Sequence, residues 1–287
     1  MPHTTHTSSH SFIFFGTPDR AVWTLERLKE LGYIPRAVVT QPDRPQGRKL
    51  IITPPPAKLW AEQNGIPVLQ PESVNSETFI AELNSYAPEF FVVVAYGKIL
   101  PEKVLAIPQF GALNLHGSLL PKLRGASPIE TAILEDVRET GPTIILMDSQ
   151  MDHGPVIAQE KIEIPDSAWP PFADELAQKI VTRGAELIAE SMPTLSQGTL
   201  IPQEQNHAAA TYTKKITKED GLIDLADDAH LNYRKYKAYK GWPGVYFFKD
   251  EDGTKIRMKI TEAEYRDGVF IVTKVIPEGK KEMAYRP

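Results

Sequence analysis

The stretch FFVVVAYGKILP (residues 90–101) decides the fold class of this 287-residue chain. Its first six residues are apolar and mostly aromatic or β-branched, which is typical of a strand that is buried on both faces. A sheet made of such strands has to be covered by helices on both sides. Tyr96 and Gly97 follow the strand directly, so they are expected where it leaves the sheet.

The same pattern recurs through the first 160 residues, where short apolar runs alternate with amphipathic helical patterns. The predicted strands lie at residues 11–16, 36–40, 90–95, 112–116 and 141–148, and the predicted helices at 19–31, 56–65 and 78–86. Apolar strands that alternate with helices predict an α/β fold with a doubly wound, mostly parallel, Rossmann-like sheet.

The pattern changes after Glu160. One long helix is predicted over residues 172–192 and a polar linker over about 193–210. A short helix (226–239) and three period-two or apolar strands (244–248, 255–260 and 268–276) follow, separated by turn residues. We therefore expect a first domain over residues 1–204, with a disordered leader at 1–10, and a smaller β-rich domain over 211–287.

The composition excludes several classes of protein. The chain has no cysteine, so disulfides and thiolate-bound metals are excluded. The N-terminus lacks a positively charged start before an apolar run, and no stretch reaches the roughly 20 apolar residues of a membrane span. We expect a soluble, cytoplasmic monomer with no membrane partner and no metal.

Charge is divided unevenly along the chain. The net charge is −5, but residues 211–287 hold 16 Lys and Arg against 13 Asp and Glu, whereas the preceding residues hold 16 against 24. The split is compatible with a basic accessory surface beside an acidic body, and equally with an ordinary solvated surface.

Phosphate-binding loops are excluded by the first predicted turn. The segment FGTPDR (residues 15–20) has a single glycine, so neither the dinucleotide fingerprint nor the P-loop is present. The function must therefore be sought in side chains near strand ends, where ligands bind in open parallel α/β sheets.

Three predicted strand ends carry polar or flexible residues, and they are expected to converge on one crevice. Asn114 and His116 are two positions apart, so they project from the same side of their strand. The strand at 90–95 is followed by Tyr96 and Gly97. The strand at 141–148 leads into Asp148, Asp152 and Gly154.

An asparagine, a histidine and an aspartate without a serine or cysteine nucleophile suit the transfer of an acyl group to an external amine. The Asn114 amide can donate to a developing oxyanion, and His116 can stabilise that charge or shuttle a proton. A carboxylate such as Asp152 orients the imidazole and favours its charged form. From spacing alone, simple packing at the strand end is the favoured interpretation of Asn114 and His116. A metal site would need a second histidine at ligand spacing, which is missing.

Two segments resemble the signature of the N10-formyltetrahydrofolate-dependent formyltransferases: NLHGSLLPKLRGASP (114–128) and MDSQMDHG (147–154). Further similar motifs span almost the whole chain: FFGTPD (14–19), TQPDRPQGR (40–48), VVVAYGKILP (92–101), GLID (221–224), WPGVYF (242–247) and PEGKKEM (277–283). The QPDRPQGR and PEGKK motifs resemble those members of the family that act on methionyl-tRNA.

The resemblance implies N10-formyltetrahydrofolate as the formyl donor and methionyl-initiator tRNA as the partner. It also implies a β-rich C-terminal domain like a shortened OB-type barrel. The implied catalytic residues are Asn114, His116 and Asp152; the implied folate-binding residues are Val94, Ala95, Tyr96, Gly97, Ser118, Leu119, Pro121 and Asp148; the implied tRNA-binding residues are Arg44, Arg48, Lys49, Lys280 and Lys281.

The chain departs from the family pattern near the expected methionine pocket. Arg20 stands where relatives commonly have an aromatic residue, and Trp23 stands where proline is frequent. Two alternatives stay open: an N-formyltransferase that acts on an amino-sugar nucleotide with the same donor, and a non-catalytic folate- or RNA-binding relative. The intact Asn114, His116 and Asp152 argue against the second, and the arginine-bearing loop has no evident role in the first.

Overall fold

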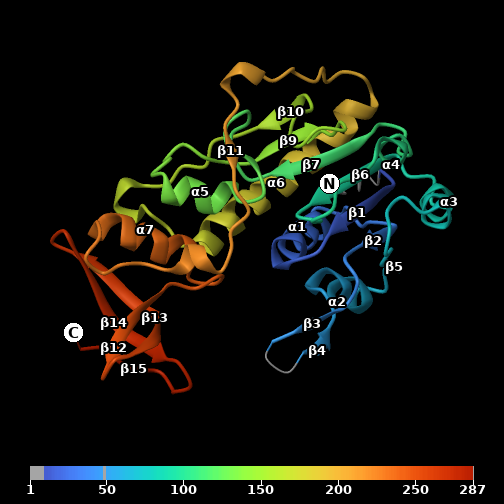
Figure 1. Ribbon diagram of the computed structural model, residues 1–287. Coiled ribbons are helices and arrows are strands. Elements are labelled where there is room, and N and C mark those ends of the chain that lie inside the picture. Colours follow the sequence, from blue (N-terminus) through green and yellow to red (C-terminus); the bar gives the residue numbers. More distant parts are fainter. Residues whose placement is uncertain (1–9, 48–49, 287) are drawn as a thin grey trace, which may run out of the picture. The chain divides into compact units, whose positions relative to one another are not determined.

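A computed structural model describes residues 10–47 and 50–286, and it divides into two compact units (Figure 1). The first contains the described residues up to 124 together with 141–161 and 178–210; the second contains 125–140, 162–177 and the residues from 211 onward. The second unit thus takes in two segments that lie before the predicted boundary. Of the predicted leader, residues 1–9 lie outside the described residues, whereas His10 packs edge-on against Phe90 with ring centroids 5.6 Å apart.

The first unit is built on a seven-stranded sheet whose centre is parallel. Five neighbouring strands, in the order β7-β6-β1-β2-β5, run parallel, which confirms the predicted mostly parallel α/β fold. The seven strands are β1 (Phe12–Gly16), β2 (Ala37–Val39), β5 (Val68–Leu69), β6 (Phe90–Val94), β7 (Ala112–His116), β9 (Thr143–Leu146) and β10 (Val156–Gln159).

One strand of the sheet, β9, runs opposite to the five parallel strands, and the edge strand β10 returns to their direction. β9 pairs antiparallel with β7, and β10 antiparallel with β9. The apolar run at 141–148 has the same composition as the parallel strands, so the sequence did not reveal this reversal. The direction follows from the connection: the chain leaves β7 at His116 and re-enters the sheet opposite that residue, at Thr143.

Helices cover both faces of this sheet, as predicted (Figure 1). On one face, Phe15 of β1 and Val93 of β6 belong to a core that includes Phe79 and Val104 from two helices. The other face of β7 packs against the longest helix, because a Cβ on Gly184 would lie 2.3 Å from Leu115 Cδ1. The helices of the first unit are α1 (Asp19–Glu30), α2 (Pro56–Gln63), α3 (Glu77–Ser85), α4 (Glu102–Leu105) and α6 (Ala173–Ser196, from residue 178 onward).

Helix α6 runs through Pro193 and therefore extends into the segment predicted as linker. A proline inside a helix cannot donate to the carbonyl four residues before it. That carbonyl belongs to Ala189, and it accepts a hydrogen bond from the Tyr33 hydroxyl at 3.1 Å. The orphaned acceptor is thus satisfied by a side chain from outside the helix, and the helix continues to Ser196.

The second unit confirms the β-rich region predicted near the end of the chain. Its antiparallel sheet has the order β12-β13-β14-β15, and buried Tyr236 and Val275 contribute to its core. Its elements are α5 (Pro128–Leu134), α7 (Ala229–Tyr239), β12 (Tyr246–Glu251), β13 (Thr254–Arg266), β14 (Val269–Pro277) and β15 (Met283–Ala284). The remaining short elements are the hairpin β3 (Arg44–Gln46) and β4 (Ile51–Thr53), the pair β8 (Arg124–Gly125) and β11 (Tyr212–Thr213), and 3₁₀ turns at Asp166–Ala168, His207–Ala209 and Glu219–Gly221.

Across the part of the chain that the structure describes, none of the helices combines the length and apolarity that crossing a bilayer requires.

A charge network ties α6 to its neighbours in the first unit. The Arg183 guanidinium donates to both carboxylate oxygens of Glu160, at 2.8 and 2.7 Å, and also to Glu186 and Glu190. Arg27 of α1 donates to the other oxygen of Glu186 at 2.6 Å. The hydrogen bonds from Arg183 lower the pKa of Glu160 below its ordinary value of 4.5.

Replacing Glu160 with Gln should reduce the loss of folding stability that the protein undergoes as the pH falls. A carboxyl whose pKa is lowered by folding contributes stability above its unfolded pKa and loses it as the pH falls through the folded pKa. Because the Glu160 side chain is 45% exposed, the contribution is at most about 1 kcal/mol. In thermal unfolding, Glu160→Gln should be less stable than the parent at neutral pH, and the two should converge below pH 4.5. Glu82→Gln, at an exposed position on α3, is the control, and a difference that is constant with pH would contradict the prediction.

Candidate active site

The structure brings together Asn114, His116 and Asp152, the three side chains that the sequence singled out. Asn114 Nδ2 lies 3.4 Å from Asp152 Oδ1, and His116 Nδ1 lies 3.5 Å from the same oxygen. Asn114 and His116 continue the face of β7 that begins at Ala112, so strand alternation alone places them side by side. Both distances are long for hydrogen bonds, as is common at catalytic sites before substrates bind.

The backbone determines which ring nitrogen of His116 carries a proton. Nε2 lies 2.9 Å from the Leu123 carbonyl oxygen, which can only accept, so Nε2 is the protonated nitrogen. Nδ1 therefore faces Asp152, either as a lone pair or, in the imidazolium, as a second donor. His116 is 5% exposed, so its ring is held between a backbone carbonyl and a carboxylate.

Asp152 reaches the pair because its loop folds back. β9 ends at Leu146, which pairs with Leu113 at the opposite end of β7 from His116, so simple convergence of strand ends does not bring Asp152 to the histidine. Residues 147–155 instead turn back toward the face that carries Asn114. Asp152 adopts a left-handed φ of 51°, and the backbone of Gly154 is packed so closely that a Cβ there would lie 1.9 Å from the Leu146 carbonyl oxygen.

Asp148 has a role within this loop. Its Oδ2 lies 2.7 Å from His153 Nδ1, and its Oδ1 accepts the backbone N–H of Gln150 at 2.8 Å. Both carboxylate oxygens thus have partners within five residues, and the side chain shapes the loop that presents Asp152. The cofactor contact expected for Asp148 stays a proposal.

The loop after β7 is held by hydroxyl groups. Ser118 is 1% exposed; its hydroxyl donates to the Lys122 carbonyl at 2.6 Å, and its own carbonyl accepts from the Thr143 hydroxyl at 2.6 Å. Leu119 is half-buried. These contacts make Ser118 a residue that forms the loop, and its contact with a cofactor stays a proposal.

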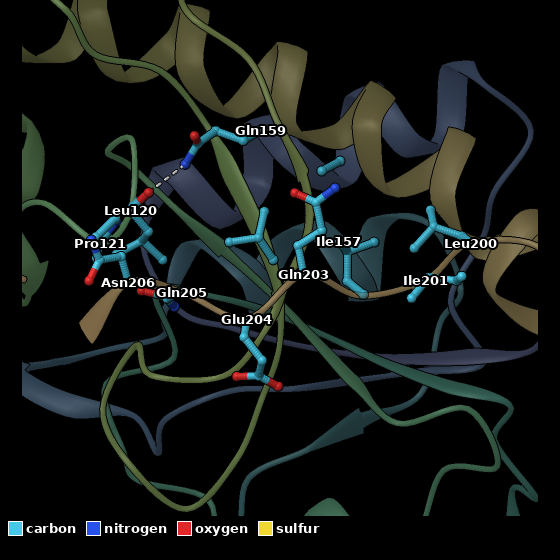
Figure 2. A pocket seen from close by; sticks show the side chains of 12 residues that line it. Leu120, Pro121, Ile157, Gln159, Leu200, Ile201, Gln203, Glu204, Gln205 and Asn206 are labelled. Carbon is cyan, nitrogen blue, oxygen red and sulfur yellow. Dashed lines mark hydrogen bonds between the residues drawn. The ribbon is translucent and has the colours of Figure 1, made fainter. Parts of the chain in front are cut away.

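Pro121 faces a groove at the edge of the sheet. It lines a groove of about 570 Å³ along the edge strand β10, and Asn114, His116 and Asp152 do not line this groove. Figure 2 shows Gln159 in the groove donating to the Leu120 carbonyl, at 2.9 Å. The lining residues are Leu120, Pro121, Val156, Ile157, Ala158, Gln159, Leu200, Ile201, Gln203, Glu204, Gln205 and Asn206.

The segment after β6 exposes backbone while burying its side chains. Val94 and Tyr96 are both 2% exposed, and Tyr96 packs edge-on against Phe15, where burial raises the pKa of its hydroxyl to about 12. Ala95 and Gly97 are exposed and adopt left-handed φ values of 50° and 84°. Polar contacts from this segment to a ligand therefore have to come from the backbone.

A braced hairpin carries Arg44. The preceding Asp43 accepts hydrogen bonds from Gln70 and Lys58, both at 2.8 Å, and these bonds lower the pKa of the Asp43 carboxyl. Arg44 itself is exposed on β3. Arg48 and Lys49, the other two basic residues expected to contact tRNA here, lie outside the described residues.

Lys280 and Lys281 are exposed and belong to the second unit, where they lie between β14 and β15. Gly279, with a φ of 75°, takes part in the turn that presents them.

Sequence reasoning missed three residues that support the site: Leu123, Arg124 and Gln205. Leu123 acts through its carbonyl, which leaves no signal in the sequence. Gln205 lies in the polar segment predicted as a linker, yet it is 6% exposed and donates to the Asp152 carbonyl at 3.0 Å. Arg124 is 2% exposed, and only the tertiary structure reveals its burial.

Within residues 10–47 and 50–286, no three His, Asp or Glu side chains gather as ligands of a metal ion.

Comparisons with known proteins place the chain in a family. Residues 11–191 match the formyl transferase model, and residues 215–268 match the model of the formyl transferase C-terminal domain. The chain therefore belongs to the formyl transferase family.

Within that family, similar curated proteins include methionyl-tRNA formyltransferases. The one from Caldanaerobacter subterraneus is 45% identical over 85% of this chain and 78% of its own length. The one from Thermodesulfovibrio yellowstonii is 38% identical over 96% of this chain and 94% of its own length.

Solved structures share the fold at low sequence identity. Methionyl-tRNA formyltransferase from Clostridium thermocellum has a TM-score of 0.61 at 17% identity, over 93% of this chain and 99% of that one. HypX from Aquifex aeolicus in complex with tetrahydrofolic acid has a TM-score of 0.65 at 16% identity, over 96% of this chain and 46% of that one.

Replacing Gly154 with Ala should destabilise the protein and displace Asp152. A Cβ at this position meets the Leu146 carbonyl oxygen, so the backbone must shift, and overpacking of this kind costs about 1–3 kcal/mol. Urea unfolding should show a lower midpoint with an unchanged slope. Gly241→Ala is the control, because a Cβ there lies 3.4 Å from the Asp174 carboxylate, an ordinary contact, and equal stability of Gly154→Ala and the parent would contradict the geometry.

Proposed function

We propose that this protein transfers the formyl group of N10-formyltetrahydrofolate to the amine of methionyl-tRNA, making formylmethionyl initiator tRNA in the cytoplasm and acting as a monomer. The observation that carries the proposal is the meeting of Asn114 and His116 at one oxygen of Asp152, in a chain of the formyl transferase family. Its relatives at 37–45% identity are methionyl-tRNA formyltransferases, which supports this acceptor.

The folate supplies the formyl carbon. In the reaction the substrate amine forms a C–N bond with that carbon, the bond from the carbon to N10 breaks, the amine loses a proton and N10 gains one. The carbonyl oxygen becomes an oxyanion in between, so the protein must supply hydrogen-bond donors for that oxygen and a route for one proton.

Asn114 and His116 can supply the donors. The 3.4 Å contact from Asn114 Nδ2 to Asp152 is weak, so the amide can exchange it for a stronger bond to a developing negative charge. The Leu123 carbonyl occupies His116 Nε2 and thereby leaves Nδ1 as the nitrogen that faces the reaction. Asp152 faces Nδ1 and orients the imidazole, and it assists the transfer of the amine proton.

The residues proposed for the folate fit a flat ring with polar edges. The exposed residues Ala95 and Gly97 carry no polar side chain, so their backbone would supply the donors and acceptors, and buried Val94 and Tyr96 keep this segment in place. The carbonyl of Tyr96 is already held by Thr17 Oγ1 at 3.1 Å and by Gln41 Nε2 at 3.0 Å. Ser118, Leu119, Pro121 and Asp148 shape the two neighbouring loops, which are proposed to border the folate.

The proposed RNA contacts come from the braced hairpin and from the second unit. Arg44, Arg48 and Lys49 suit phosphates and exposed bases of the acceptor end, and Lys280 and Lys281 suit backbone phosphates. Trp23 on α1, which is half-buried, is proposed to take the place of the usual aromatic residue beside the methionine side chain.

Asn114→Ala and His116→Ala should each lower kcat by at least ~100-fold, as losses of oxyanion donors do. The measurement is the transfer of labelled formyl from N10-formyltetrahydrofolate to methionyl-tRNA. Asn84→Ala, at an exposed position on α3, is the control. Turnover close to the parental value in either variant would remove that residue from the proposed mechanism.

The same assay, with uncharged tRNA and an amino-sugar nucleotide as acceptors, tests the proposed substrate. Product on methionyl-tRNA alone supports the proposal. Product on the sugar nucleotide alone would retain the catalytic residues and overturn the RNA partner. Folate binding without product on any acceptor would favour a non-catalytic relative.

Binding of methionyl-tRNA should weaken steeply with salt, because phosphate contacts release counterions. The double variant Lys280→Gln/Lys281→Gln should bind more weakly and should lower the slope of log K against log salt by about 1–2. Folate affinity should not change. Lys103→Gln/Lys179→Gln removes the same charge from exposed positions elsewhere, so an equal effect of this control on the slope would exclude a specific role for Lys280 and Lys281.

A further inference from the structure

The loop that carries Asp152 adopts a conformation that needs outside support. Asp152 has a φ of 51°, in the left-handed region that L residues other than glycine seldom adopt. The neighbouring Met151 is 57% exposed, so the tip of the loop has few contacts to hold it. The position of the Asp152 carboxylate must therefore be stabilised by contacts with other parts of the first unit.

Gln205 supplies two of these contacts. Its Nε2 donates to the Asp152 carbonyl at 3.0 Å and to the Gly154 carbonyl at 2.7 Å. A carboxamide nitrogen has two hydrogens, and here they bind the backbone on either side of His153. The side chain is 6% exposed, so these bonds are protected from water.

Arg124 fixes the orientation of the Gln205 amide. Its Nη2 lies 2.6 Å from Gln205 Oε1, and because a guanidinium can only donate, the amide oxygen must face Arg124 and the amide nitrogen must face the loop. Arg124 is itself 2% exposed. We use the term Gln205 bracket for this set of groups: Arg124, Gln205 and the two backbone carbonyls to which Gln205 donates.

A second contact strengthens this bracket. Arg124 Nη2 also lies 2.9 Å from His207 Nδ1, and the His207 ring stacks on His153 with centroids 3.9 Å apart and planes 1° from parallel. His153 in turn contacts Asp148. The segment 205–207 therefore holds the loop through its backbone and through its His153 side chain.

Arg124, the first residue of the bracket, directly follows Leu123, whose carbonyl binds His116. Leu123 accepts the His116 Nε2–H, and Arg124 acts on Asp152 through Gln205. Two consecutive residues thus determine the positions of the imidazole and of the carboxylate that faces it.

We propose that Gln205 and Arg124 are positioning residues for formyl transfer: the Gln205 bracket sets the Asp152 carboxylate against Asn114 and His116. The inference rests on the proposed function of that site. Gln205 acts through the backbone of the Asp152 loop, and Arg124 acts through the Gln205 amide. A displacement of about 1 Å at a catalytic group can lower the rate by about 100-fold, so a bracket of this kind has a large effect on turnover.

The test compares Gln205→Met, Gln205→Glu and the control Gln203→Met. Gln205→Met keeps the length of the side chain and removes all its hydrogen bonds. Gln205→Glu keeps an acceptor for Arg124 but turns an oxygen toward the two carbonyls, so it removes only the donors that hold the loop. Gln203 is exposed in the same segment and is the matched control.

Both Gln205 variants should lower kcat by about 10–100-fold while the KM for folate stays unchanged, and Gln203→Met should behave as the parent. Parental kcat in Gln205→Glu would show that the glutamine only satisfies Arg124 and would overturn the proposal. If kcat and the folded fraction of a Gln205 variant, the latter measured by thermal unfolding, fall by the same factor, the proposal is also overturned.

A crystal structure of Gln205→Met decides the inference independently of the acceptor. The Asp152 carboxylate should move away from Asn114 and His116 by about 1 Å or more. An unmoved carboxylate would overturn the bracket even if the parent formylates methionyl-tRNA. If the parent instead formylates a different amine, the proposed function fails, and the ratio of variant to parent kcat on that amine still tests the bracket.

Discussion

The antiparallel pairing of β9 with β7 is the constraint on which the site depends. It places the end of β9 beside Leu113, away from His116, so the chain has to fold back to bring Asp152 to the catalytic pair. The fold-back in turn requires a residue without Cβ at Gly154, a left-handed Asp152 and a buried partner for the loop backbone. The position of one carboxylate thus follows from the direction of one strand.

Strand β7 combines two environments in five residues. Leu113 and Leu115 are buried on the face that α6 covers, and Asn114 and His116 project from the other face, beyond the apolar core under α3 and α4. The packed side holds the strand rigid, and the polar side presents two hydrogen-bonding groups at a spacing set by the pleat. A site on a buried strand holds its geometry more closely than a site on a loop alone.

Much of the fold and part of the site could be predicted from the sequence. Strand and helix type follow from local periodicity, and the common face of Asn114 and His116 follows from their spacing of two residues. The direction of β9 could not be predicted, because an apolar run such as TIIL has the same pattern in either direction. The continuation of α6 through Pro193 also depended on a distant group, the Tyr33 hydroxyl.

The amino-acid sequence by itself determined the α/β class, the β-rich second region and the pair of polar side chains at the end of β7, because these depend on neighbours within a few positions. The tertiary structure decided how Asp152 approaches that pair, which nitrogen of His116 faces it, and that Arg124 and Gln205 are buried beneath the loop. The reason is distance along the chain: Asn114 and Asp152 are 38 residues apart, Gln205 and Asp152 are 53 apart, and Arg124 and Gln205 are 81 apart. Contacts over such separations exist only once the sheet has assembled, and no local pattern encodes them.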